Sequence, residues 1–141
     1  METERDELGY LIFRICRAQN SLANIIFSEI GLFRGQPPVL FQLGKHKELT
    51  QSQLADMLEV TPATLTNILH RMEKTGLINR TRDAGDNRIS RVTLTALGEE
   101  RLAQAFALSQ RIEDRTFDSF SEDEKKTIRS FLQQIHTNLT D

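Results

Sequence analysis

The sequence of 141 residues lacks several features that mark particular protein classes. Its single cysteine, Cys16, excludes an internal disulfide framework and a zinc site built from cysteines. No apolar run approaches the roughly 20 residues needed to cross a bilayer. The chain begins Met-Glu-Thr-Glu-Arg-Asp-Glu, which is acidic where a signal peptide is basic and then apolar. We therefore expect a cytoplasmic protein that does not associate with a membrane.

Aromatic residues are missing from the middle of the chain. All eight phenylalanines and the one tyrosine lie outside residues 42–105. Proteins that bind single-stranded nucleic acids stack the bases on aromatic side chains. The gap therefore argues against that function and makes the two ends the aromatic-rich part of the chain.

An excess of basic residues is also missing. The 18 lysines and arginines are outnumbered by 20 aspartates and glutamates, for a formal net charge of −2. On average such a field slightly repels phosphate, which argues against a strongly basic nucleic-acid-binding protein. The charges are unevenly placed, however. Residues 61–95 hold six basic and three acidic residues, so a locally basic segment lies within an acidic chain.

The sequence contains no pattern typical of a catalytic site. We find no nucleophile next to a base, no phosphate-binding glycine loop and no metal-binding constellation. The histidines at 46, 70 and 136 are scattered, and no two of them have the spacing of metal ligands on a helix. We therefore predict that the protein is not an enzyme and needs no metal or cofactor.

Helical periodicity predicts long helices near both ends of the chain. The first spans about residues 4–30, another follows Thr95 to about Phe117, and the last begins at the capping box Ser121-x-x-Glu124. One copy of these helices can hardly enclose its own core. We therefore predict that residues 1–35 and 96–141 form a homodimerisation region, with a monomeric bundle as the alternative.

Residues 36–95 have the turn signals of a compact lobe. Two prolines begin a helix that runs to about Lys45, and Thr50 and Thr61 each begin a further one. The helices at 50–58 and 61–75, joined by a tight connection, predict a helix-turn-helix. Strand-like runs at 77–82 and 89–95 then flank turn-forming residues and predict a two-stranded hairpin.

The second helix of a helix-turn-helix enters the DNA major groove. Here its apolar residues share one face, and the opposite face has the residue types that contact bases and phosphates. Since the first residues of such a helix usually reach the bases, the candidates are Thr61, Ala63, Thr64, Thr66, Asn67, His70 and Arg71. An ordinary solvated helix face is the alternative.

The hairpin is rich in arginine. An arginine at the tip of a two-stranded arm can reach the minor groove of DNA. Asp86 lies two residues before Arg88 and can hold its guanidinium in one orientation, which lowers the entropy lost on binding. The candidate residues of this wing are Arg80, Arg82, Asp86, Arg88 and Arg91. A surface ion pair without a role in binding is the alternative.

Residues 49–98 resemble the winged helix-turn-helix of the MarR family of transcription regulators. The most specific match is Asp83-x-x-Asp86-x-Arg88, followed by Val-Thr-Leu-Thr-x-x-Gly at 92–98. The order of the terminal helices is also similar to that family. The resemblance implies a mainly α (α+β) fold in which a winged helix-turn-helix with a two-stranded wing joins N- and C-terminal dimerisation helices.

The resemblance also implies a function. It implies a homodimer that binds a pseudo-palindromic double-stranded DNA operator, usually as a repressor and less often as an activator. Family members often release DNA when a small aromatic or phenolic effector binds between the dimer helices and the DNA-binding lobe. By position, an apolar wall of that site would come from Phe13, Phe27, Phe33 and Phe41, which are otherwise core residues.

Two other functions fit the same sequence. Some family members sense peroxides through a cysteine on the first helix, and Cys16 lies there between the cationic Arg14 and Arg17, which is the kind of surrounding that can make a thiol reactive. Cys16 is late relative to the sensing position, however, and a lone cysteine is usually a small apolar residue. A winged-helix module that binds protein is the second alternative, although it has no need of the wing arginines.

Overall fold

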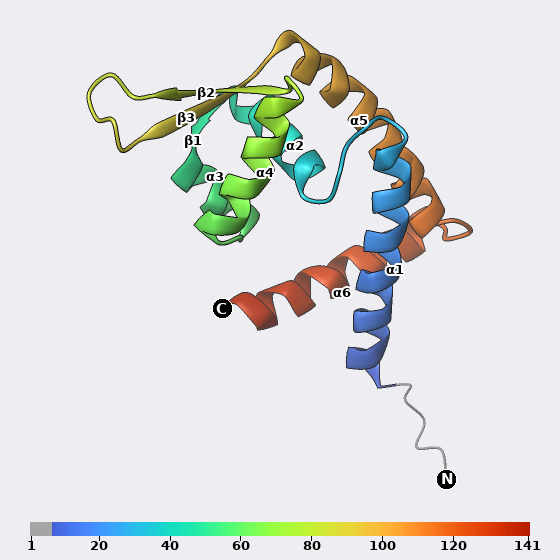
Figure 1. The fold of residues 1–141 in the computed structure, drawn as a ribbon. Coiled ribbons are helices and arrows are strands. Elements are labelled where there is room, and N and C mark those ends of the chain that lie inside the picture. Colours follow the sequence, from blue (N-terminus) through green and yellow to red (C-terminus); the bar gives the residue numbers. More distant parts are fainter. Residues whose placement is uncertain (1–6) are drawn as a thin grey trace.

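The computed structural model describes residues 7–141. The first residues of the predicted N-terminal helix, and most of the acidic segment before it, lie outside this range. The described elements are α1 (Leu8–Ser28), α2 (Gln36–His46), β1 (Glu48–Thr50), α3 (Gln51–Leu58), α4 (Pro62–Lys74), β2 (Ile78–Arg82), β3 (Ser90–Leu94), α5 (Ala96–Thr116) and α6 (Glu122–Thr140). The predicted mainly helical fold with a winged hairpin is confirmed (Figure 1).

The predicted helix starts are confirmed by their caps. Helices α3, α4, α5 and α6 each begin after a residue whose hydroxyl accepts a hydrogen bond from the backbone N–H three residues later. These residues are Thr50, Thr61, Thr95 and Ser121. Such a cap stabilises a helix by about 1 kcal/mol. The predicted first helix is shorter than expected at its C-terminal end, because the chain turns at residues 29–31 and Gly31 has a φ of 72°.

The sheet has one strand more than the sequence predicted. Its order is β1-β3-β2, and Val92 of the central strand pairs with Leu49 on one side and Arg80 on the other. The strand β1 has only three residues, too few to show an alternating pattern, and its last residue is the cap of α3. The β2–β3 hairpin continues beyond β1 and forms the projecting wing (Figure 1).

The core lies in the middle of the chain. Nine of the ten largest fully buried side chains belong to residues 36–95, and these are Val39, Leu40, Leu43, Leu54, Leu65, Leu69, Met72, Ile78 and Val92. Helix α5 joins this core through Leu102, whose side chain packs directly on Gly44 of α2, where a Cβ has no room. Most of the core therefore lies in the lobe that holds the helix-turn-helix, and α5 and the end of α1 complete it.

A single residue joins the lobe to α5. Thr95 follows β3 directly, its N–H donates to the Leu77 carbonyl at 3.1 Å and its hydroxyl donates to the Gly76 carbonyl. The same hydroxyl accepts from the Gly98 N–H at 3.0 Å. Gly98 itself packs against the Leu77 carbonyl too closely for any side chain. The wing, the end of α4 and the start of α5 are thus tied together at one point.

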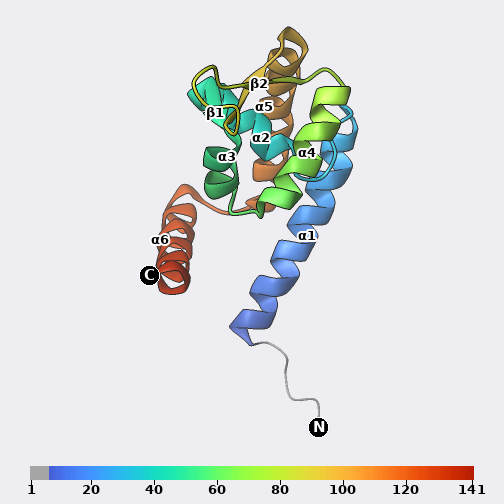
Figure 2. The ribbon, with the colours of Figure 1, turned by 60° about the vertical axis from the view of Figure 1, so that its left-hand side comes forward.

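The two terminal helices contrast with the lobe. In α1 only Ile26 and Phe27 are buried, and no residue of α6 is buried. The helices overlap in Figure 1, but in Figure 2 they separate, with α1 and α6 extending from the molecule with open space between them. Within the described residues, no helix combines the length and apolar character needed to cross a membrane.

Candidate nucleic-acid interface

Helix α4 divides its residues between two faces as predicted. Leu65, Leu69 and Met72 are fully buried and Ile68 is partly buried, which fixes the helix to the lobe. The face turned to solvent exposes every residue that we selected as a DNA contact, namely Thr61, Ala63, Thr64, Thr66, Asn67, His70 and Arg71. Their contact with DNA stays a prediction, but each side chain is accessible.

The hydroxyl groups at the start of α4 are partly used by the helix itself. The Thr61 hydroxyl accepts from the Thr64 N–H at 3.2 Å and donates to the Thr64 hydroxyl at 2.9 Å. The Thr66 hydroxyl donates to the Pro62 carbonyl at 2.8 Å. Because a hydroxyl has one proton and two lone pairs, Thr66 can still accept a hydrogen bond from DNA.

The larger polar side chains of α4 are uncommitted. Within residues 7–141, the side chains of Asn67, His70 and Arg71 make no hydrogen bond or ion pair that would have to break before they bind DNA. Asparagine can bond adenine, and arginine can bond guanine, through two hydrogen bonds each. These residues can therefore distinguish bases.

The turn of the wing is organised by Asp83. Its Oδ2 accepts from the N–H groups of Gly85 and Asp86 at 3.0 and 3.1 Å, and its Oδ1 accepts from Arg91 Nε at 2.8 Å. These bonds, with the Arg91 bond as the largest contribution, hold the pKa of the Asp83 carboxyl below its ordinary value. Asp83 is therefore charged at neutral pH and fixes the shape of the loop.

The predicted pairing of Asp86 with Arg88 is present. Asp86 Oδ1 accepts from Arg88 Nε and its Oδ2 accepts from Arg88 Nη2, both at 3.1 Å. Hydrogen bonds from the Arg88 side chain, and then from its backbone N–H, lower the pKa of Asp86. A guanidinium has five N–H donors, so about three remain for DNA. The Arg88 side chain is 90% exposed, so it is both oriented and accessible.

The other three wing arginines have partners inside the protein. Arg82 Nη1 donates to the Asn87 carbonyl at 2.8 Å, and Arg91 pairs with Asp83 and, at 4.0 Å, with Glu48. Arg80 is the least exposed of the three and pairs with Glu73 at 2.9 Å. We predicted all three as DNA contacts, and the structure places Arg80 and Arg91 in bonds that hold the lobe together.

The wing and the helix-turn-helix face one common hollow. A cavity of about 470 Å³ is lined by the first residues of α3, by Pro62 at the start of α4, and by Arg88 and Ser90 of the wing. In a helix-turn-helix the first helix crosses the DNA backbone while the second enters the groove. The hollow therefore puts Gln51, Ser52 and Ser90 beside Arg88 and the start of α4.

These three polar residues, and Asp83 and Glu73, were not selected from the sequence. A polar residue in the first turn of a short helix looks like any solvated position, and its place beside the wing depends on the tertiary fold. Asp83 did carry a signal, because it opens the wing motif. Its role in closing the turn depends on bonds that the spacing alone does not specify.

A second cavity of about 470 Å³ lies between α1, the α1–α2 connection, α2 and α5. Phe27, Phe33 and Phe41, three of the four phenylalanines named for an effector site, line this cavity, and effector binding there stays a prediction. Phe13 does not, because it lies nearer the N-terminal end of α1. There its ring stacks on Tyr10, with 6.4 Å between the ring centroids, and Arg17 Cζ lies 5.8 Å from the centroid of the Phe13 ring. Asn24, Arg34 and Glu113 give the mostly apolar cavity polar edges.

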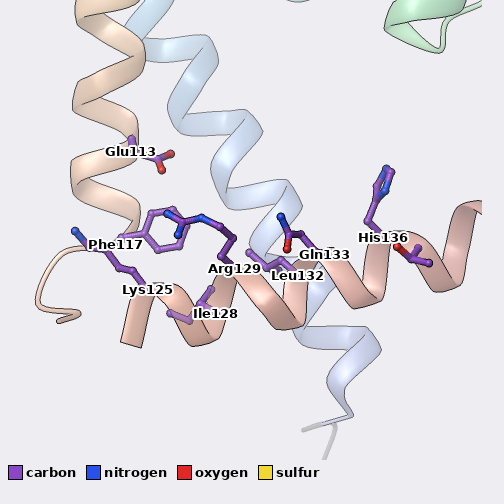
Figure 3. A pocket seen from close by; sticks show the side chains of 9 residues that line it. Glu113, Phe117, Lys125, Ile128, Arg129, Leu132, Gln133 and His136 are labelled. Atoms are coloured by element: carbon purple, nitrogen blue, oxygen red, sulfur yellow. The ribbon is translucent and has the colours of Figure 1, made fainter. Parts of the chain in front are cut away.

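A third, more open space of about 600 Å³ lies between the end of α5 and α6. Figure 3 shows Arg129, Gln133 and His136 projecting from one face of α6 into this space, with Glu113 and Phe117 contributed by α5. Ile128 and Leu132 form its apolar floor along α6. Ile128 and Leu132 are thus apolar residues of α6 that border this open space.

Cys16 is exposed on α1. Among the described residues no group of three or more histidine, cysteine, aspartate or glutamate side chains is arranged to hold a metal ion. Redox sensing through Cys16 stays an untested alternative.

Comparisons with known proteins agree with this geometry. The family model described as the MarR family matches residues 34–90. An uncharacterised HTH-type transcriptional regulator of Bacillus cereus is 30% identical over 126 residues, which cover 89% of this chain and 84% of that protein. The transcriptional regulator HosA of Escherichia coli is 30% identical over 104 residues, or 74% of this chain and 77% of HosA.

Solved structures are similar over nearly the whole chain. The transcriptional regulator SlyA has a TM-score of 0.85 and 26% identity, covering 94% of each chain. A cysteine-to-serine mutant of MarR from E. coli, solved in complex with operator DNA, has a TM-score of 0.83 and 26% identity, covering 91% of this chain and 92% of MarR. With the winged helix-turn-helix geometry, these matches establish that the chain belongs to the MarR family of DNA-binding transcriptional regulators.

Proposed function

We propose that two copies of this chain bind one pseudo-palindromic operator as a repressor. Each recognition helix α4 enters a major groove, and each Arg88 enters the neighbouring minor groove. One observation carries the proposal: the start of α4, at Pro62, and the oriented Arg88 line one hollow, and the exposed polar face of α4 belongs to the same lobe. The MarR structure that contains operator DNA supports it by similarity.

The surface area supports a dimer. A compact monomer of 16.2 kDa exposes roughly 7,500 Å². This chain exposes 10462 Å². The excess of about 3,000 Å² per chain corresponds to about 6,000 Å² for two chains, which is at the upper end of the area that obligate homodimers bury, about 2,000–5,000 Å² or more in total.

The apolar residues of the terminal helices support a second copy as the occupant. Along α1, Leu8, Phe13 and Ile15 are 79, 54 and 59% exposed, and along α6 Phe131 and Leu139 are 65 and 79% exposed. Large exposed apolar side chains gathered along two helices mark an interaction site. Because α1 and α6 extend away from the lobe, a second chain can insert its own terminal helices between them (Figure 2).

Selection of bound duplexes from a random pool tests the proposal directly. We expect enrichment of an inverted repeat whose half-site centres lie about one helical turn, or ~34 Å, apart. Sedimentation of the free protein at micromolar concentration should give a species of twice 16.2 kDa. A clean monomer that enriches no sequence would overturn the proposal, and enrichment of a single unrepeated half-site would overturn its symmetric form.

We propose further that a small aromatic or phenolic effector releases the operator by binding in the cavity between α1, α2 and α5. The cavity volume of about 470 Å³ is in the range of small-molecule sites. Three phenylalanine rings supply an apolar wall, and Arg34 and Asn24 supply polar groups that can orient a hydroxyl or carboxylate.

A direct contact links this cavity to the recognition helix. Gly35, which lines the cavity, has a φ of 87°, and a Cβ at this position would lie 2.6 Å from Ile68 Cδ1 of α4. Glycine thus allows the α1–α2 connection to pack against α4 itself. Movement of this connection by a ligand is therefore transmitted to the helix that reads DNA.

Shortening the contact residue tests the link. Ile68→Val removes Cδ1 and should leave operator binding nearly intact. The concentration of phenol or benzoate that is needed to release the operator should rise several-fold. Ile78→Val is a matched control, since it removes the same methyl from a buried position in β2, at about 0.5–1.5 kcal/mol of stability. If a panel of phenols and benzoates never releases the wild-type protein, the effector proposal is wrong. Equal responses of the two variants would exclude the Gly35–Ile68 route.

A further inference from the structure

We propose that Arg80 is a positioning residue that sets the angle between the recognition helix and the wing, and is not itself a DNA contact. The inference rests on the proposed function, because the angle matters only if both parts bind one duplex. In this proposal the positive charge of Arg80 serves to hold elements of the lobe together and does not bind phosphate.

The Arg80 side chain joins three elements. It projects from β2, where its backbone pairs with Val92 of the central strand. Its Nη2 donates to Glu73 Oε1 of α4 at 2.9 Å, and its Nη1 lies 3.5 Å from Gln51 Oε1 at the start of α3. One guanidinium thus connects both helices of the helix-turn-helix to the base of the wing.

Exposure and charge favour this arrangement. The Arg80 side chain is only 20% exposed, compared with 90% for Arg88 at the wing tip. Its hydrogen bond and charge are the main factors that lower the pKa of Glu73, so the carboxylate is ionised at neutral pH. To reach a phosphate, Arg80 would have to leave a charged partner and a partly buried site, which costs free energy.

The position of Arg80 gives it leverage over the DNA-binding groups. The reading face of α4 lies before Glu73 in the chain, and Arg88 lies beyond β2 at the far end of the hairpin. A small change of angle at the base of the wing therefore moves Arg88 by a larger distance. Misplacing a binding group by about 1 Å is enough to weaken an interaction that depends on geometry.

Glu73→Gln separates the two roles. If Arg80 contacted phosphate, removal of the neighbouring negative charge would free the arginine and strengthen DNA binding or leave it unchanged. A positioning role predicts the opposite, a loss of about three- to tenfold in affinity for the duplex that the wild-type protein selects, as expected when one charge-assisted hydrogen bond is lost. The variant keeps every basic residue of the interface.

Arg80→Gln adds a salt-dependence measurement. Each phosphate contact contributes about 0.9 to the slope of log affinity against log salt, so a dimer that lost two would lose about 1.8. We expect Arg80→Gln to lose about as much affinity as Glu73→Gln and to keep the wild-type slope. The double variant should lose little more DNA affinity than either single variant, because both substitutions break the same bond.

The matched control is Lys74→Gln, which removes an exposed basic charge next to Glu73. It should lower the salt slope if Lys74 lies near phosphate, and it should show additive behaviour with Arg80→Gln. Thermal unfolding of each variant identifies any that has lost the fold. Glu73 is exposed, so Glu73→Gln remains interpretable if Arg80→Gln is unstable.

The free protein offers a test without DNA. We expect Arg80→Gln to accelerate amide hydrogen exchange at the end of α4 and in β2, while exchange in α5 and α6 stays at the wild-type rate. Unchanged exchange in α4 and β2, or a salt slope reduced by about 1.8, would overturn the positioning role. A wild-type protein that selects no duplex would overturn the proposed function, whatever the exchange data show for Arg80.

Discussion

The lobe of residues 36–95 and the terminal helices α1 and α6 have opposite relations to solvent. Of the large apolar side chains that are exposed, only Met57 belongs to the lobe, whereas α1 and α6 together expose most of theirs. The lobe also contains the basic segment and has a small excess of basic residues, whereas the remainder of the chain has 10 basic and 14 acidic residues. The lobe therefore buries its apolar side chains and carries the basic segment, whereas the terminal helices leave theirs open to solvent, as the proposed dimer requires.

The largest expected effect comes from placing a charge on the exposed apolar face of a terminal helix. Phe131→Glu places a charge in the exposed apolar face of α6, where Phe131 is 65% exposed. We expect a monomer in sedimentation and a loss of operator affinity of about 10²–10⁴-fold, since the second half-site no longer adds its binding energy. Met57→Glu, the same change in the lobe, should leave the sedimentation coefficient unchanged. A dimeric Phe131→Glu protein would show that α6 is not part of the interface.

On the lobe side, Arg88→Ala removes the exposed guanidinium at the wing tip. We expect operator affinity to fall by about 10- to 100-fold, because each subunit loses one groove contact. The melting temperature should stay close to that of the wild type, since an exposed ion pair adds little stability. Fluorescence anisotropy and thermal unfolding measure the two effects. Unchanged affinity would contradict a role of the wing in binding.

Asn67→Ala should alter selectivity more than overall affinity. The exposed amide is placed to bond a base edge, so its loss should remove about 1–3 kcal/mol of discrimination at one or two base positions. Selection from random duplexes with this variant would show which positions lose their preference. Uniform weakening across all sequences would assign Asn67 to phosphate instead.

The smallest effect concerns the protonation of the wing. Because the bond to Arg88 lowers the pKa of Asp86, the folded protein is stabilised above the unfolded pKa of about 3.9, and this contribution is lost as the pH falls through the lower folded value. Lowering the pH from 7 to 5 should therefore leave the wing intact. In an NMR titration, the midpoint of Asp86 should rise towards about 3.9 in Arg88→Ala. An unchanged midpoint would mean that the pair is not populated in solution.

The sequence predicted the lobe well because its signals are local. Caps such as Thr50 and Thr95 and the spacing of Asp86 and Arg88 act within a few residues, and the structure confirms them. Features that depend on distant segments were missed. The strand β1 exists because Leu49 meets Val92, and Arg80 looked like a DNA contact because its partner Glu73 lies on a different element.

The direct passage of β3 into α5 through Thr95 has a consequence for the spacing of the operator. Its three hydrogen bonds make a rigid corner rather than a hinge, and no flexible linker separates the reading surface from the helices that face a second copy. In the proposed dimer without effector, this corner then limits the distance and rotation between the two recognition helices. Because one added base pair turns a half-site by about 35° around the duplex axis, we expect the protein to tolerate changes of half-site sequence better than a single-base-pair change of spacing.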